Sequence, residues 1–365
     1  MNDLKIDYES YYFACDPFIE AAKAWGCWCL IIVGARNRGK TYSALKYALD
    51  RKEQIIFCKR TADDVQLLCA AGKNDDFDDD LSPYADLNDD LGCNIKPHSI
   101  YNGVASFNNI IDGKPSFKAG YCFAISMVAK YKGFGGLRKC KYLIFDEFIP
   151  APWERTFTKL EGESVLDLYK TASRDREERG NEPMLLICLA NANNLSNQMF
   201  NALEITDEVA DMAINHEDIR KIGRKLVVLV DDDKLAIAKE QEKTLIYDDM
   251  KDTVWGQVTF NNEFARNDLT CVRVRSIKGM KCRCKVLFKN ETWFIYQKDG
   301  EFYVCDSNSN QYQRDYSLYI ESDVKHFYLR DGVAVIDAYY KGKASFQKFR
   351  MYDVIIHFKK FFNIQ

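Results

Sequence analysis

The stretch that decides the fold is Trp28-Cys-Leu-Ile-Ile-Val33, followed directly by Gly34-Ala-Arg-Asn-Arg-Gly39-Lys40-Thr41. The apolar run predicts a buried strand, and Leu45, Ala48 and Leu49 beyond it share one face of an amphipathic helix. The residues between strand and helix match G-x-x-x-x-G-K-[ST]. In this motif the glycines let backbone N–H groups point at a phosphate, and the helix N-terminus adds positive charge. The sequence therefore predicts a phosphate-binding P-loop.

The side chains of such a loop have distinct tasks. Lys40 would reach the β- and γ-phosphates, and Thr41 would ligate Mg²⁺ through its hydroxyl. The pattern thus predicts ATP and Mg²⁺ as cofactors. The residues predicted to contact ATP are Gly34, Ala35, Arg36, Asn37, Arg38, Gly39, Lys40, Thr41 and Tyr42.

Another predicted strand carries two carboxylates at its end. The run Tyr142-Leu-Ile-Phe-Asp146-Glu147 begins apolar and finishes acidic. Following a P-loop, this is the pattern of a Walker B element, in which Asp146 would hold Mg²⁺ through water. Glu147 would then be placed to polarise the attacking water.

Two more buried strands end in polar residues. The strand at Gln54–Cys58 is followed by Lys59 and Arg60, and the strand at Met184–Ala190 is followed by Asn191. The Asn191 amide could hydrogen-bond the γ-phosphate or the attacking water. Strands that all finish in polar residues at one edge place the ligand at the carboxyl ends of a parallel sheet.

Three further segments have weaker patterns. The basic cluster from Ser173 to Gly180 closes a predicted helix and, taken alone, is more typical of a solvated helix end. The stretch from Asp75 to Asp90 has eight aspartates and predicts a solvated loop, because metal loops need a more regular spacing. The alternation from Val104 to Ile125, with an Asp112-Gly113 turn, predicts a β-hairpin inserted into the nucleotide-binding fold.

Composition narrows the classes of protein that remain. The 365 residues allow two domains, and 47% hydrophobic and 29% charged residues are typical of a globular chain. No apolar run is long enough for a membrane helix, and we expect no secretory signal. The thirteen cysteines form no C-x-x-C pair. Their spacing favours reduced thiols over a disulfide framework or a zinc site. The net charge of −3 is uneven, since residues 271–365 hold 17 Lys and Arg against 10 Asp and Glu. That asymmetry indicates an anionic partner for the C-terminal part.

The C-terminal part is predicted to be a small α/β domain. Its short alternating strands are Val272–Arg275, Cys282–Val286, Trp293–Tyr296 and Phe302–Cys305, followed by a helical stretch from Ser345 to Phe362. The alternating Arg273, Arg275, Arg283 and Lys285 suit contact with a phosphate backbone, with a solvated sheet face as the open alternative. A two-metal nuclease needs converging carboxylates, and only Asp306 stands at a plausible strand end, so nuclease activity is predicted to be absent.

Four motifs together resemble the DNA-packaging ATPase (DNA encapsidation protein) family of phi-twenty-nine-like small podoviruses. They are Gly34-Ala-Arg-x-x-Gly-Lys-Thr, Phe145–Ile149, Tyr169–Glu177 and Cys188–Ala192. The resemblance implies an α/β fold. Residues 1–213 would be a P-loop ATPase domain of the additional-strand, catalytic-glutamate (ASCE) class, a parallel sheet with helices on both faces. Residues 214–262 would be a helical linker subdomain, and residues 263–365 a vestigial ribonuclease H-like domain related to the nuclease of large terminases.

The same resemblance implies roles for individual residues. Glu147 would be the catalytic glutamate, and Arg174 an arginine finger that acts in trans on the neighbouring subunit's ATP, with Arg176 as the runner-up. Asn191 would sense the hydrolysis state, and Lys132 would be a lid lysine. Basic residues expected near the subunit interface are Lys59 and Arg60, and those expected to grip DNA are Arg155 and Lys159.

The expected function is therefore that of a genome-packaging motor. It would hydrolyse ATP to move double-stranded DNA through the portal (connector) into a prohead, as a homopentameric ring, with a packaging RNA as an open further partner and no membrane. It would work in the cytoplasm of the infected bacterial host, docked transiently on the prohead and absent from the mature virion. Two alternatives remain at this point: a helicase-like or partition-type ATPase without a capsid role, and a non-hydrolysing nucleotide switch.

Overall fold

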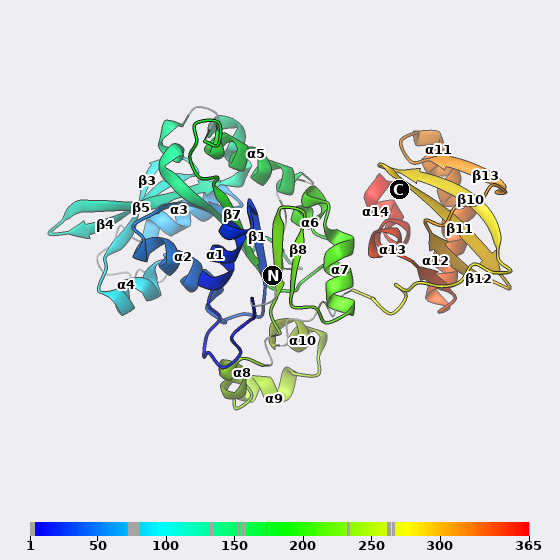
Figure 1. Cartoon of the computed structure of the whole chain (residues 1–365), viewed down its shortest axis with the longest axis horizontal. Coiled ribbons are helices and arrows are strands. Elements are labelled where there is room, and N and C mark those ends of the chain that lie inside the picture. The colour runs from blue at the N-terminus through cyan, green and yellow to red at the C-terminus, as the bar shows by residue number, and fades with distance from the viewer. Residues whose placement is uncertain are drawn as a thin grey trace. The chain divides into compact units, whose positions relative to one another are not determined.

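The chain divides into two compact units, each described here by itself. The computed structural model describes residues 4–71, 81–131, 134–151, 153, 154, 156, 158, 160–174, 176–231, 234–260, 264 and 267–364. The first unit comprises Met1–Ile205 and Asn215–Arg266, and the second comprises Thr206–Ile214 and Asn267–Gln365 (Figure 1).

The first unit is built on a nine-stranded sheet of order β3-β4-β5-β2-β6-β7-β1-β9-β8. The P-loop strand β1 pairs in parallel with β7, β7 with β6, β6 with β2, and β2 with β5. Because β7 stands between the P-loop strand and the Walker B strand β6, it is the additional strand that the resemblance implied. The strands are β1 (Cys29–Val33), β2 (Gln54–Lys59), β3 (Ile95–Tyr101), β4 (Val104–Ile111), β5 (Lys114–Ala124), β6 (Cys140–Asp146), β7 (Leu185–Ala190), β8 (Ile219–Ile222) and β9 (Lys225–Leu229).

Helices cover both faces of this sheet (Figure 1). On one face α1 (Asp16–Ala24), α2 (Lys40–Asp50) and α3 (Ala62–Ala71) pack against alternate strand residues such as Leu30 and Ile55. On the other face lies α5 (Glu161–Ser173), whose Tyr169 ring packs 5.2 Å from that of Trp28. The remaining helical segments are α4 (Ala85–Leu91), η1 (Ile125–Tyr131), η2 (Gly135–Lys139), α6 (Gln198–Leu203), α8 (Ala236–Gln241), α9 (Leu245–Met250) and α10 (Val254–Phe260).

Each edge of the sheet carries strands that the sequence had not placed in it. The predicted hairpin is present as β4 and β5, and Asp112 and Gly113 both take positive φ at its turn, as a tight hairpin requires. It extends the main sheet, with β3 as a further strand. The range 214–262 is only partly a linker, because β8 and β9 complete the sheet. Buried Leu226 and Val228 on β9, which pairs with β1, supply the apolar contacts that hold it there.

The second unit has a five-stranded sheet of order β13-β10-β11-β12-β14. Strands β10, β11 and β12 are antiparallel, while β13 runs parallel to β10 and β14 parallel to β12. Val272 forms only an isolated bridge with Phe346, so the strand predicted at Val272–Arg275 is absent from the described residues. The elements are β10 (Lys281–Phe288), β11 (Glu291–Lys298), β12 (Glu301–Cys305), β13 (Arg314–Ser317), β14 (Ala344–Phe346), α7 (Thr206–Ile214), α11 (Glu321–Phe327), the π-helical η4 (Tyr328–Gly332), α12 (Val333–Tyr340), α13 (Phe349–Ile356) and α14 (Phe358–Phe362).

The cysteines are distributed through both cores. All thirteen are free thiols and all are buried except Cys93, which is partly exposed. Burial raises the pKa of the Cys122 and Cys140 thiols to about 12. None of the helices that the structure describes is long and apolar enough to cross a membrane.

Candidate nucleotide-binding site

The P-loop joins the end of β1 to the start of α2. Gly39 caps α2 in the left-handed region at φ +84°, where a side chain would be strained. A Cβ built there would also lie 3.1 Å from the Cβ of Tyr12. The second glycine of the motif is therefore required by the backbone itself.

A cleft of about 380 Å³ opens above this loop. It brings together the P-loop, the end of β6 and the end of β7, as expected from strands that finish in polar residues. Asp86 and Ala190 also line the cleft. The sequence had indicated for Asp86 only a solvated acidic loop, and no local signal places α4 here. The lining residues are Arg36, Asn37, Arg38, Gly39, Lys40, Thr41, Tyr42, Asp86, Asp146, Glu147, Ala190 and Asn191.

Lys40 is turned back onto its own loop. Its Nζ donates hydrogen bonds to the carbonyls of Gly34 at 2.8 Å and Ala35 at 2.6 Å, and it lies 3.4 Å from Oδ1 of Asn191. The side chain is only 8% exposed. A cation held by oxygens in this way is suited to exchange them for phosphate oxygens, so the loop fits a polyphosphate. Gly34 and Ala35 thus take part through backbone atoms.

Thr41 and Asp146 are in direct contact. The Thr41 hydroxyl donates a 2.8 Å hydrogen bond to Oδ2 of Asp146, although the two residues are 105 positions apart. Burial raises the pKa of the Asp146 carboxyl, the repulsion of Glu147 adds to that, and the Thr41 hydrogen bond opposes it. A hydroxyl and a carboxylate are the oxygen ligands that Mg²⁺ prefers. The pair therefore fits the predicted metal site.

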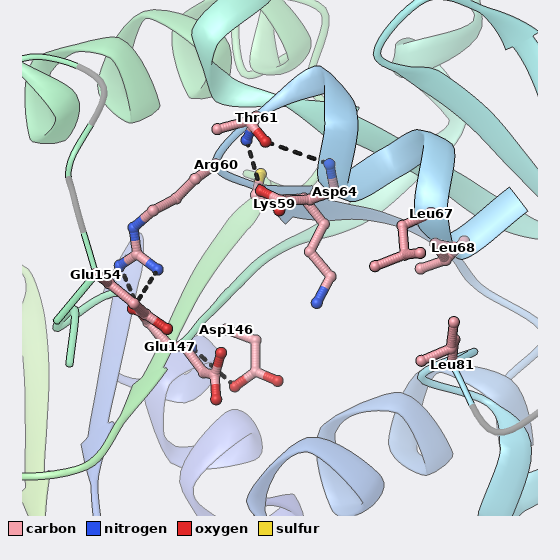
Figure 2. A pocket seen from close by; sticks show the side chains of 11 residues that line it. Lys59, Arg60, Thr61, Asp64, Leu67, Leu68, Leu81, Asp146, Glu147 and Glu154 are labelled. Carbon is pink, nitrogen blue, oxygen red and sulfur yellow. Dashed lines mark hydrogen bonds and ion pairs between the residues drawn. The ribbon is translucent and has the colours of Figure 1, made fainter. Parts of the chain in front are cut away.

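Glu147 has an exposed side chain and an unusual backbone. Its φ is +54°, which is uncommon for a residue with a side chain and is concentrated at functional sites. Its N–H donates to Oδ1 of Asp146 at 3.0 Å, and its carbonyl accepts a hydrogen bond from Arg60 Nη2 (Figure 2). The turn thus projects the carboxylate away from the strand, beside the predicted metal ligand Asp146.

Arg60 is fixed within its own chain. Its Nε lies 3.1 Å from Oε1 of Glu161, which is 1% exposed, and its Nη1 lies 3.4 Å from Oε2 of Glu154. These ion pairs, with the bond to the Glu147 carbonyl, leave the guanidinium bound to three groups of its own chain. Figure 2 shows Arg60 beside two of them, Glu154 and Glu147. Arg60 is thus engaged within its own chain, and the interface role expected for it stays a prediction.

Lys59 has a different environment. It extends into a pocket of about 310 Å³ that it shares with Asp146 and Glu147 (Figure 2). Its charge counteracts the rise in the pKa of Asp146, and its Nζ lies 5.6 Å from the centre of the Phe57 ring. Its ammonium group forms no hydrogen bond or ion pair with the residues that the structure describes, and the interface role expected for Lys59 stays a prediction.

The two candidate finger arginines differ. Arg176 is 9% exposed, and its Nη2 donates to the carbonyls of Arg138 at 2.7 Å and Cys140 at 2.6 Å. Arg174 is half-buried at the end of α5, and its guanidinium bonds no side chain among the described residues. Both lie at the amino-terminal edge of the sheet, where β6 begins. The 13 residues of α5 put that edge roughly 20 Å from Glu161 and the nucleotide cleft.

The basic residues of the second unit are largely engaged. Arg283 pairs with Asp331, Lys285 with Asp315, and Arg275 with Glu301. Arg273 is exposed, and no described side chain pairs with it. The predicted residues Lys132, Arg155 and Lys159 lie outside the described residues.

Comparisons with known proteins bear on the fold. No protein-family model matches the chain, and no curated protein does so. A solved structure titled the Phi-28 gp11 DNA packaging motor is similar over 97% of this chain and 98% of its own, at 15% identity and a TM-score of 0.55. The chain therefore has the fold of that packaging motor. The N-terminal domain of the DNA packaging ATPase from bacteriophage phi29 matches 58% of this chain and 94% of its own, at 20% identity and a TM-score of 0.42.

The match to the packaging motor spans both units of the chain. It confirms the fold class expected from the sequence, a P-loop sheet followed by a small C-terminal α/β domain. At 15% identity the likeness concerns the fold.

Proposed function

We propose that this chain is a viral genome-packaging ATPase that moves double-stranded DNA through a portal into a prohead. The observation that carries the proposal is the Thr41–Asp146 contact with Glu147 beside it, set in a fold that matches a DNA packaging motor over 97% of the chain. The basic surplus of residues 271–365 is consistent with an anionic partner.

The residues of the cleft have separate roles in ATP hydrolysis. Lys40 and the loop N–H groups would hold the phosphates, while Thr41 and Asp146 would hold Mg²⁺. When bound, Mg²⁺ neutralises charge on the phosphate oxygens. Glu147, exposed at the cleft, would accept a proton from the attacking water as general base. Asn191, 3.4 Å from Lys40 Nζ, would stand at the γ-phosphate and distinguish ATP from ADP.

The position of Arg174 supports a role in trans. At roughly 20 Å from its own nucleotide cleft, its guanidinium cannot reach the ATP of the same chain. In a ring it could reach the neighbour's ATP, and it has no competing partner among the described side chains. Arg176, bound to two backbone carbonyls, is less suited. We therefore assign the finger to Arg174 in a ring, with five subunits as the resemblance implies.

The proposed partners follow from this activity. They are double-stranded DNA, the portal and prohead, other copies of the chain, and a packaging RNA as a further partner. The work would take place in the cytoplasm of an infected bacterium, with the motor leaving before the virion matures. The second unit would contribute no nuclease activity, since Asp331, its fully buried carboxylate, is paired with two arginines and is unavailable to metal.

The direct test compares wild type with Glu147→Gln for DNA-stimulated ATP hydrolysis and for DNA encapsidation by proheads. Loss of a general base is expected to slow hydrolysis about a hundredfold or more, with ATP still bound. Glu163→Gln, an exposed glutamate on α5, is the matched control. Unchanged turnover in Glu147→Gln contradicts the assignment.

The same measurements on wild type separate the alternative functions. DNA-stimulated hydrolysis without encapsidation indicates a helicase-like or partition-type ATPase, and negligible turnover of wild type with DNA indicates a non-hydrolysing nucleotide switch.

The finger has its own test. Arg174→Ala protein and Glu147→Gln protein, each inactive alone, should regain hydrolysis when mixed, because the first supplies an intact site and the second an intact arginine. Absence of any rescue across mixing ratios would exclude action in trans.

A further inference from the structure

An aromatic cavity lies at the amino-terminal edge of the main sheet, at the opposite end of β1 from the P-loop. It has a volume of about 670 Å³, and its aromatic and charged lining residues are Trp25, Trp28, Tyr169, Glu177, Lys221 and Arg224. Strand β1 starts directly after Trp28, and its five residues span roughly 16 Å before the P-loop begins. The cavity is therefore separate from the nucleotide cleft, and the proposed hydrolysis does not use it.

Two of the rings form a wall that the backbone holds in place. The N–H of Trp28 donates a 3.0 Å hydrogen bond to the carbonyl of Arg224, and the Trp28 carbonyl accepts a 2.9 Å bond from the N–H of Leu186. The Tyr169 ring packs 5.2 Å from the Trp28 ring at a tilt of 46°, and the Tyr169 hydroxyl donates to the Met184 carbonyl at 2.8 Å. This aromatic surface is thus formed before any ligand arrives.

Trp25 forms another part of the wall, from the end of α1. It is half-buried, and Lys221 Nζ donates a 2.9 Å hydrogen bond to its carbonyl. The indole N–H groups of Trp25 and Trp28 form no hydrogen bond with any residue in the described part of the chain. Since tryptophan N–H groups that leave water usually find an acceptor, the cavity offers flat apolar surface together with two donors for a ligand's acceptors.

Opposite charges line the same cavity without pairing. The exposed Arg224 guanidinium and the exposed Glu177 carboxylate have no ion pair or hydrogen bond among the described residues. A ligand that meets both needs an anionic group and a hydrogen-bond donor. A nucleotide has both, because its phosphate suits a guanidinium and its base carries ring N–H or amino groups that donate to a carboxylate. The flat base also stacks on aromatic side chains, whereas bases inside a duplex are covered by their neighbours.

We propose that this cavity binds an unpaired nucleobase of a single-stranded nucleic acid, with the base stacked on Trp25 and Trp28 and its phosphate on Arg224. RNA and DNA strands share this chemistry, and the test separates them. A proline-rich peptide also stacks on aromatic side chains, but it brings no anionic group to Arg224. The site goes beyond the proposed motor activity, whose substrate is double-stranded DNA with its bases paired.

The test measures binding to the full-length chain by fluorescence anisotropy. The labelled probes are a ten-nucleotide oligo(U), a ten-nucleotide oligo(dT) and a DNA duplex of the same length. The variants are Trp25→Leu, which removes a stacking surface, and Arg224→Ala, which removes an exposed charge and leaves the core intact. Tyr101→Leu and Lys114→Ala, at exposed positions of the β3–β5 strands, are the matched controls.

Trp25→Leu should weaken binding of the preferred single strand about fivefold to a hundredfold and leave duplex binding unchanged. Arg224→Ala should lower the slope of log K against log salt for that strand by about 0.7, and the controls should bind as wild type. The strand that shows these effects, oligo(U) or oligo(dT), identifies the ligand as RNA or DNA.

Unchanged binding of both single strands by Arg224→Ala, or by folded Trp25→Leu, overturns the proposal. An equal loss of duplex binding does so as well, and so does a wild-type chain that binds a ten-residue oligoproline peptide more tightly than either strand. Since neither Trp25 nor Arg224 lines the nucleotide cleft, both variants should hydrolyse ATP as wild type does. Failure of this proposal is therefore distinguishable from failure of the proposed ATPase activity.

Discussion

Arg60 donates a hydrogen bond to the backbone carbonyl of Glu147 and, through Nε, pairs with the buried carboxylate of Glu161. It thereby joins the end of β2 to the turn after β6 and to the start of α5. Glu147 takes a φ of +54°, a conformation that its neighbours must hold in place. Arg60 is therefore a positioning residue for the proposed general base.

Arg60→Ala should lower kcat for ATP hydrolysis about tenfold to a hundredfold and leave KM for ATP nearly unchanged. The glutamate would be displaced while the P-loop contacts remain intact. Steady-state kinetics measure both constants, and Arg51→Ala, which removes an exposed ion pair with Glu20, is the matched control. In a Glu147→Gln background the same substitution should have little further effect, whereas a purely structural arginine would slow that variant as well.

Arg176→Ala should destabilise the first unit by about 2 kcal/mol, because it removes two hydrogen bonds and leaves the buried Cys140 carbonyl with one acceptor site unfilled. Arg174→Ala should change the free energy of unfolding by no more than about 0.5 kcal/mol, since its guanidinium forms no hydrogen bond or ion pair with a described side chain. Urea unfolding of the two variants measures the difference. Equal losses would mean that Arg174 is also structural.

Asp331→Asn should destabilise the second unit by about 3 kcal/mol. Asp331 is 0% exposed and is bound by Arg283, Arg314 and the Tyr316 hydroxyl. Burial opposes ionisation, but these three partners outweigh it and lower the pKa of Asp331. Hydrogen exchange along β10 reports the loss of protection, and exposed Asp337→Asn is the control.

The ionisation of Asp331 makes the stability of the second unit depend on pH. A lowered pKa in the folded state means that the ionised form stabilises the fold at any pH above the pKa of the unfolded chain, about 3.9. That contribution is lost as the pH falls below this value toward the folded pKa. The stability difference between wild type and Asp331→Asn should therefore be constant near pH 7 and shrink below about pH 4. A difference that grows on acidification would contradict the assignment.

Arg273→Ala should weaken DNA binding and reduce the slope of log K against log salt by about one unit. Arg273 is exposed with no paired side chain in the described part of the chain, so its charge is available to a phosphate. Lys285→Ala should change the slope less, because Lys285 is paired with Asp315. Titrations at several salt concentrations measure both slopes, and equal effects would show that intrachain pairing does not decide which residues touch DNA.

The parts of the site that the sequence predicted are those whose chemistry is local. The P-loop residues are consecutive in the sequence, and the positions of their glycines indicate the backbone conformation that the motif needs. Asp146 and Asn191 were predicted at the same edge because both follow buried parallel strands, and the 2.8 Å contact of Thr41 with Asp146 agrees with that prediction. The additional strand β7 was implied by the resemblance to the packaging ATPases and is present in the sheet between β1 and β6.

The parts that were missed depend on contacts between distant positions. The pairing of Arg283 with Asp331 joins residues 48 positions apart, and it engages a side chain that alternation alone assigned to DNA. Arg60 similarly pairs with Glu161, 101 positions away. Strands β8 and β9 fall in the range expected to be a linker, because charged residues within them, such as Lys221 and Lys225, interrupt the apolar pattern of two short strands. Neither spacing nor composition encodes such long-range partners.

The burial of the thiols leaves one position of the proposed motor open to covalent labelling without any engineering. Twelve of the thirteen cysteines are enclosed in the two cores, and only Cys93 is partly exposed. Maleimides react with thiolates, which buried thiols of raised pKa seldom form, so one dye should attach at one position of the natural chain. Cys93 stands two residues beyond the end of α4. Because Asp86 of α4 lines the nucleotide cleft, a fluorophore at Cys93 should change its emission when ATP binds there.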